Sequence, residues 1–150
     1  MNRRAVLGGL AGALYLPAIV RADPATLDLA AWRGKVFYVD FWASWCGPCR
    51  QAFPFMADLL QRHASQGLVV LTVNQDRARA AGEAFLRQVN AHLPVIWDAD
   101  GNLGQTWRIN AMPTTLVFDR KGGLRLRREG FQPQDAAATR DAVEKLLHER

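Results

Sequence analysis

A dense apolar segment that ends beside a pair of cysteines places the strongest limit on how this chain can fold. Residues 35–42 hold six β-branched or aromatic side chains interrupted only by Asp40, a pattern typical of a strand in the centre of a sheet. After the cysteines, apolar residues recur three and four positions apart up to Gly67, and this spacing indicates a helix. Cys46 and Cys49 therefore lie where a buried strand gives way to a helix.

The remainder of the chain predicts alternating strands and helices that close with a hairpin. We expect strands at residues 68–73, 93–97, 114–118 and 123–128, and helices at residues 77–93, near 98–107 and from Pro133 onward. Alternating strands and helices imply parallel pairing, and the hairpin adds antiparallel pairing. The expected fold is one α/β domain, with a central mixed β-sheet flanked by helices on both faces.

The first 22 residues have the composition of an export signal. Two arginines stand near the start, and about sixteen small or apolar residues follow them. Because this run is shorter than the roughly 20 apolar residues that span a bilayer, we expect cleavage near Ala22, with a membrane tether by an uncleaved N-terminus as the alternative. The paired arginines resemble a twin-arginine signal and leave the export route open. Residues 23–150 would then form a periplasmic or otherwise exported domain.

The net charge of +5 does not point to nucleic acid. Three of the 19 basic residues lie in the first 22 positions, which contain no acidic residue, so the rest of the chain carries 16 basic and 14 acidic residues. These charges are mostly interspersed. The basic run from Arg120 to Arg128 alternates with apolar residues, as a solvent-facing strand would, and we expect no nucleic-acid partner.

The spacing of the two cysteines predicts thiol–disulfide exchange. Cysteines three residues apart in a first helical turn face the same side and can form a disulfide. Unpaired N–H groups and the helix dipole would stabilise the thiolate of Cys46, which is the attacking form. Cys49 should be more buried and should resolve the mixed disulfide formed on Cys46. Pro48 fits an early helical position because its missing N–H costs little there.

A zinc site and a structural disulfide are the alternatives for these cysteines. A zinc finger would need a second histidine at positions 67–69 after His63, but none stands there, and the chain has only two cysteines. A structural disulfide that spans two residues would remove little chain entropy. We therefore expect no metal and no other cofactor, and we interpret His63, His92 and His148 as surface or helix-end residues.

The segment Val39–Arg50, with the sequence VDFWASWCGPCR, resembles the active site of the thioredoxin superfamily. The order of elements, with an extra helix near residues 77–93, resembles the exported TlpA/ResA-like thiol–disulfide reductases. The resemblance covers about residues 27–147. It implies a thioredoxin fold with the extra helix before a cis-proline loop, and it implies protein-disulfide reductase activity.

The same resemblance assigns residues around the cysteines. Met112-Pro113-Thr114 matches the cis-proline loop, so Pro113 would follow a cis peptide bond, and the backbone of Met112 would pair with an extended substrate segment. Trp45 would offer a partly exposed apolar surface to substrates, beside Gly47 and Pro48. Trp42 is expected in the core.

Asp40 is a further position that we single out. A carboxylate within an apolar strand is costly to bury, and burial raises its pKa. Such a group can accept the proton of Cys49 while the mixed disulfide is resolved. The alternative is a carboxylate at a hydrated edge with no chemical role.

This sequence departs from the TlpA/ResA-like family in three places, and these differences bear on the identity of its physiological partner more than on the chemistry. TlpA-like proteins usually have an N-terminal hairpin, whereas only residues 23–34 precede the central strand here. They often carry a glutamate at the position of Ala52 and an asparagine at the position of Asp40.

We expect an exported monomer that reduces protein disulfides, among which apocytochrome c is a candidate in cytochrome c maturation. Its electrons would come from a membrane thiol-transfer protein resembling DsbD or CcdA. One alternative is net disulfide oxidation or isomerisation. Another is a non-catalytic copper chaperone, although Sco-type copper proteins use a three-residue gap between cysteines and a distal histidine, and neither occurs here.

Overall fold

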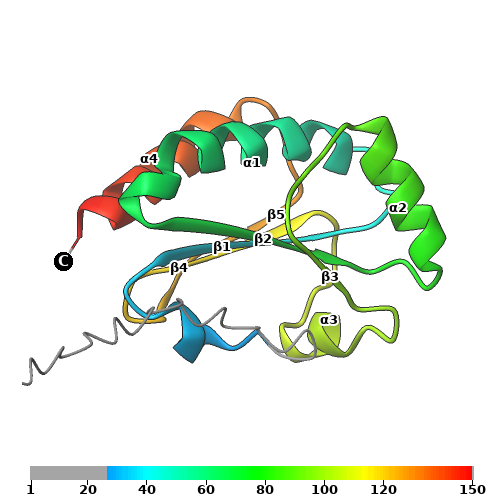
Figure 1. Ribbon diagram of the computed structural model, residues 1–150, viewed down its shortest axis with the longest axis horizontal. Coiled ribbons are helices and arrows are strands. Elements are labelled where there is room, and N and C mark those ends of the chain that lie inside the picture. Colours follow the sequence, from blue (N-terminus) through cyan, green and yellow to red (C-terminus); the bar gives the residue numbers. More distant parts are fainter. Residues whose placement is uncertain (1–26, 150) are drawn as a thin grey trace, which may run out of the picture.

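The computed structural model describes residues 27–149, so the expected export signal lies outside the described residues (Figure 1). Five strands form one sheet in the order β3-β2-β1-β4-β5. The strands are β1 (Val36–Trp42), β2 (Leu68–Asn74), β3 (Val95–Trp97), β4 (Thr114–Phe118) and β5 (Leu124–Glu129). The β1–β2 and β2–β3 pairs are parallel, and the β1–β4 and β4–β5 pairs are antiparallel. The predicted mixed sheet is therefore confirmed.

Helices cover both faces of this sheet. The α-helices are α1 (Cys49–His63), α2 (Arg79–Gln88), α3 (Asn102–Thr106) and α4 (Asp135–His148), with short 3-10 helices at Leu29–Trp32 and Ala64–Gln66. Figure 1 shows α1, α2 and α4 on one face, and α3 with the first 3-10 helix on the other. The predicted order of elements is confirmed, and the first 3-10 helix is an addition to it.

All seven residues of β1 are buried, as expected for the central strand. Because successive side chains point to opposite faces, Val36, Tyr38 and Trp42 pack into the core under α1 and α4, whereas Phe37 and Phe41 pack into the core on the α3 side. Asp40 has the parity of the first set, so it lies on the face that carries the two cysteines.

The helix after β2 is shorter than the predicted span of residues 77–93. Asn90 has a positive φ of 50°, a conformation that ends helices, and the N–H of Ala91 donates to the C=O of Leu86. This capping pattern stops α2 at Gln88. Periodic apolar residues continue past it, because Val89, Ala91 and Leu93 still pack against the core cluster to which α1 contributes.

The basic run from Arg120 was expected to face solvent throughout, and for Arg120 this is wrong. Its half-buried guanidinium donates to the C=O groups of Gly34, Gln66 and Leu147 at 2.8, 3.0 and 2.8 Å. These carbonyls lie at the ends of three different segments. Arg120 therefore ties together the entry to β1, the entry to β2 and the end of α4.

Within residues 27–149, no helix has both the length and the apolar character needed to cross a membrane.

Candidate active site

The two cysteines form a disulfide at the point where β1 leads into α1. Their Cα atoms are 5.4 Å apart, Cys46 is 4% exposed and Cys49 is completely buried. The expected difference in burial is thus present, but it is small in this oxidised form. The helix begins at Cys49, so Cys46 lies in the turn before α1 and not inside the first helical turn. Within that turn, the Cys46 N–H donates to the C=O of Ala43.

The start of α1 presents its positive end without a neutralising group. No side chain caps the helix at Pro48, and its first turn contains no acidic residue. The aligned peptide dipoles of a helix favour a negative charge near its N-terminal end. This end of α1 can therefore stabilise a thiolate on Cys46 when the disulfide is reduced.

Three exposed residues lie next to the buried Cys46 in the sequence. Trp45 is 70% exposed, and Gly47 and Pro48 are exposed on the other side of Cys46. Trp42, by contrast, is completely buried, as predicted, in edge contact with Phe53. The rim of the site thus offers an apolar surface and accessible backbone next to Cys46.

The loop before β4 has the predicted cis peptide bond between Met112 and Pro113. Thr114 pairs with Phe41, so this loop lies beside the end of β1 that leads to the cysteines. The Thr114 hydroxyl donates to the C=O of Ala111 at 2.7 Å. In the described part of the chain, neither the N–H nor the C=O of Met112 takes part in a hydrogen bond. Both groups are therefore available to an extended peptide.

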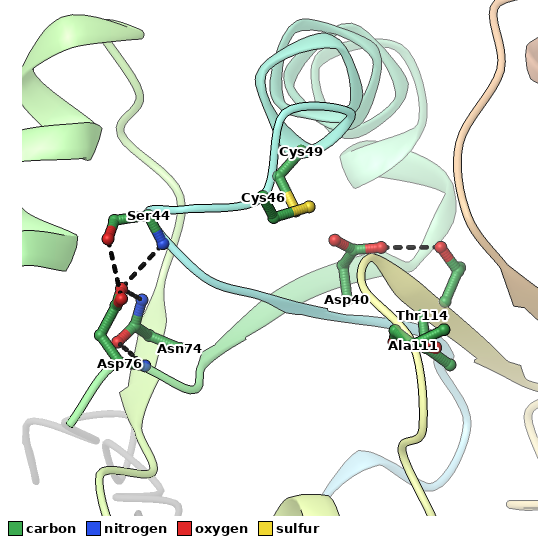
Figure 2. The surroundings of a disulfide bond; sticks show 9 residues. Asp40, Ser44, Cys46, Cys49, Asn74, Asp76, Ala111 and Thr114 are labelled. Atoms are coloured by element: carbon green, nitrogen blue, oxygen red, sulfur yellow. Dashed lines mark hydrogen bonds between the residues drawn. A yellow bond between two sulfur atoms is a disulfide. The ribbon is translucent and has the colours of Figure 1, made fainter.

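Asp40 is buried, with 1% of its surface exposed, and burial raises its pKa from 3.8 to about 7. The expected burial and the expected direction of the pKa shift are both confirmed. Its Oδ1 accepts a hydrogen bond of 2.7 Å from the Thr115 hydroxyl, while Oδ2 is buried without a partner among residues 27–149. Figure 2 shows the Asp40 side chain on the side of β1 that carries the disulfide.

Two buried neighbours of Asp40 were missed by sequence reasoning. Thr115 lies directly opposite Asp40 in the β1–β4 pair, and its hydroxyl oxygen is also 3.3 Å from the Tyr38 hydroxyl. Burial raises the pKa of Tyr38 far above its usual range. The sequence did offer one signal for Tyr38: it stands two residues from Asp40 on the same strand, so the two side chains share a face of the sheet.

A second polar network holds the loop between β1 and Cys46. The buried Asp76 carboxylate accepts hydrogen bonds from the Ser44 N–H, the Ser44 hydroxyl and the Asn74 side chain, at 2.9, 2.8 and 2.7 Å (Figure 2). Asn74 in turn accepts from the Asp76 N–H at 3.0 Å. Sequence reasoning missed this network too, because Asp76 is 32 residues from Ser44 in the chain.

The histidines were interpreted as surface or helix-end residues, and this is confirmed, although His63 is more buried than a surface residue. It is the last residue of α1, but it is only 8% exposed, with Nε2 3.3 Å from Glu144 on α4. His92 and His148 are exposed. Among residues 27–149, no three His, Cys, Asp or Glu side chains gather where they could hold a metal ion.

One apolar pocket lies away from the disulfide. It has a volume of about 430 Å³ and lies between α1 and the segment after α2, where Phe53, Pro54, Leu60 and residues 89–93 line it. Neither cysteine borders this pocket, and Asp40 does not border it either.

Comparison with known proteins adds family information to this geometry. The profile of the family described as Redoxin matches residues 11–147. The thiol-disulfide oxidoreductase ResA of Bacillus subtilis is 29% identical over 96 residues, which are 64% of this chain and 54% of that protein. Across the first curated relatives, the chain spans between 53% and 63% of their length.

Solved structures match over most of their length. A Chlorobium tepidum protein assigned as a thiol:disulfide interchange protein DsbE is 38% identical with a TM-score of 0.76, over 79% of this chain and 84% of that one. The exposed lipoprotein thioredoxin Etrx1 of Streptococcus pneumoniae is 28% identical with a TM-score of 0.66, over 79% of this chain and 90% of that one.

Proposed function

The chain belongs to the redoxin family, as a ResA-like member of the thioredoxin superfamily, and from that premise we propose that it is a thiol–disulfide oxidoreductase that reduces protein disulfides. The observation that carries this proposal is the Cys46–Cys49 pair at the uncapped start of α1. The pair has accessible backbone and an exposed indole beside it, and a buried carboxylate on the same face of the sheet.

The reduced protein begins with a thiolate on Cys46. This sulfur attacks one sulfur of a substrate disulfide, so that a Cys46–substrate bond forms and the second substrate sulfur leaves. The positive end of α1 favours the thiolate before the attack. The exposed Trp45 and the free backbone groups of Met112 would hold the substrate segment alongside.

Cys49 completes the exchange. The Asp40 carboxylate accepts the proton of the Cys49 thiol, and the resulting thiolate attacks the Cys46 sulfur. The Cys46–Cys49 disulfide forms, and the substrate leaves as a dithiol. Its two electrons come from the protein dithiol, one proton comes from Cys49 through Asp40, and the other comes from solvent in place of the proton that Cys46 had already lost. A carboxyl group with a pKa of about 7 suits this transfer, because it accepts and releases protons near neutral pH.

We further propose that residues 1–22 direct export and that residues 23–150 work as a monomer outside the cytoplasm. The electron donor would be a membrane thiol-transfer protein of the DsbD or CcdA kind. Apocytochrome c, with its paired cysteines, is a candidate substrate. The name of the DsbE-like structural relative and the exposed location named for Etrx1 support an exported redox role.

A trapping experiment tests the proposal. Cys49→Ala, expressed in the native compartment, should retain substrates covalently on Cys46, and they should be released by a reducing agent. Cys46→Ala is the matched control, and it should retain none. Alkylation of the wild-type protein in cells separates reduction from oxidation, since a reductant rests mainly as the dithiol. No mixed disulfide with Cys49→Ala would contradict the exchange mechanism.

A further inference from the structure

Asp40 and Thr115 lie directly opposite each other on β1 and β4, and both are almost completely buried. The Thr115 hydroxyl donates to Asp40 Oδ1 at 2.7 Å. A hydroxyl has one hydrogen to donate. Since that hydrogen points to Asp40, the 3.3 Å contact between Thr115 and Tyr38 must be donated by the tyrosine.

The result is an ordered chain of donors from Tyr38 to Thr115 to Asp40. Tyr38 remains a donor across the physiological range, because burial holds its pKa far above the usual value. Hydrogen bonds in series polarise one another in a low-dielectric core. The two hydrogen bonds in series therefore stabilise a single carboxylate oxygen, Oδ1 of Asp40.

We propose that Thr115, supported by Tyr38, is a positioning residue that holds Oδ1 of Asp40 and leaves Oδ2 as the atom that takes the Cys49 proton. This inference rests on the proposed exchange mechanism. Oδ2 has no partner among residues 27–149, so it is free for a proton. Thr115 opposes the effect of burial, since a hydrogen bond to the charged form of a carboxylate lowers its pKa. Without that bond, Asp40 would stay protonated at neutral pH and could not act as the base.

The other ionisable groups near Tyr38, Thr115 and Asp40 lie on neighbouring elements. Cys46 and Cys49 lie on the same face at the start of α1, and Arg128 pairs with Thr115 from β5. The positive charge of Arg128 acts on Tyr38, and its Nη1 is 3.3 Å from Asp135 on α4. The pKa of Asp40 is set by its burial and by Thr115.

Thr115→Val removes the hydroxyl and keeps the shape, whereas Thr115→Ser keeps the hydroxyl. The Asp40 carboxyl is followed by carbon-13 NMR in the oxidised protein, as a readout that does not depend on activity. The pH dependence of mixed-disulfide resolution is measured separately in the reduced protein. We expect Thr115→Val to raise both midpoints, that of the Asp40 carboxyl titration and that of the pH profile of resolution, by about one to two pH units. Thr115→Ser should restore both to near the wild-type values.

Tyr38→Phe provides a second variant if Thr115→Val does not fold, and it should raise both midpoints by a smaller amount. An unchanged carboxyl midpoint in the valine or phenylalanine variant would overturn the inference and leave the proposed function intact. A raised carboxyl midpoint without any change in the kinetic profile would overturn the role in proton transfer. Failure of the proposed function itself appears elsewhere, as the absence of a trapped substrate on Cys46.

Discussion

The carboxylate of Asp76 accepts hydrogen bonds from both the backbone N–H and the hydroxyl of Ser44, at 2.9 and 2.8 Å. Asp76 follows β2 and Ser44 follows β1, so the two bonds join the ends of adjacent parallel strands. Asn74 orients the carboxylate with a third hydrogen bond. Because Ser44 is two residues before Cys46, this contact anchors the loop that carries the attacking sulfur.

Loss of this anchor should destabilise the protein in proportion to the bonds removed. Asp76→Ala leaves the Ser44 N–H and the Asn74 amide unpaired, and we expect it to lower the free energy of unfolding by about 1–3 kcal/mol. Ser44→Ala keeps the backbone bond and should cost about 1 kcal/mol or less. Urea unfolding of the oxidised proteins measures both. Equal losses in the two variants would show that neither the Ser44 backbone bond nor the Asn74 bond contributes to stability.

The pH dependence of stability should carry the signature of Asp40. Its folded pKa of about 7 is above its unfolded value of 3.8, so the folded state binds more protons between these values. The contribution of this proton binding to the free energy of unfolding is fully present below about pH 4, and it is lost as the pH rises through about 7. The loss amounts to about 4 kcal/mol.

Asp40→Asn should remove this dependence and make the oxidised protein more stable than the wild type above pH 7. Chemical unfolding at several pH values provides the measurement. The half-buried carboxyls of Asp58, Asp119 and Glu149 have pKa values lowered by hydrogen bonds to their neighbours. They act in the opposite direction and at lower pH, so the difference between wild type and variant isolates Asp40. A variant with the same pH slope as the wild type would contradict the buried carboxylate.

Trp45 should matter for protein substrates and not for stability. Its indole is 70% exposed next to Cys46, whereas Leu124, the matched control, is 46% exposed on β5. We expect Trp45→Ala to raise KM for a protein disulfide about tenfold, which is about 1.4 kcal/mol. Leu124→Ala should leave KM unchanged. Steady-state kinetics with a protein substrate and a thermal melt distinguish the two effects, and equal KM values for both variants would exclude Trp45 from the docking surface.

Arg120 should be a structural residue in spite of its charge. It donates to three backbone carbonyls, and Arg120→Ala would leave them without these partners. We expect a loss of about 1–3 kcal/mol in the free energy of unfolding. Lys121→Ala removes the exposed neighbouring charge and should change stability by less than about 0.5 kcal/mol. Similar values for both variants would show that the carbonyl contacts are replaced by water at no cost.

Much of the fold could be predicted from sequence because the apolar pattern of the strands matches their burial. The run around Asp40 became the central strand, and Thr114–Phe118 became β4 with the predicted bounds. Helix ends were harder to predict. The end of α2 depends on the backbone of Asn90, and the start of α1 depends on a turn at Cys46. Neither feature changes the apolar periodicity.

The site was predicted where its residues are close in sequence and missed where they are not. Cys46 and Cys49 form one motif, and Asp40 is conspicuous as a charge in an apolar strand. Thr115 and Asp76 reach the site through the register of β4 and the end of β2. An ordinary threonine or aspartate gives no local signal of such a contact. These two residues become visible only when the strands are paired.

The thiol titration of the reduced protein tests the proposed chemistry most directly. The rate of alkylation of each cysteine is measured against pH, with Cys49→Ala and Cys46→Ala used to assign the signals. We predict that Cys46 reacts as a thiolate with a midpoint well below the roughly 8.5 of a free cysteine, and that Cys49 reacts far more slowly. Titration of Cys46 at the value of a free cysteine, with no excess of reactivity over Cys49, would contradict the proposal.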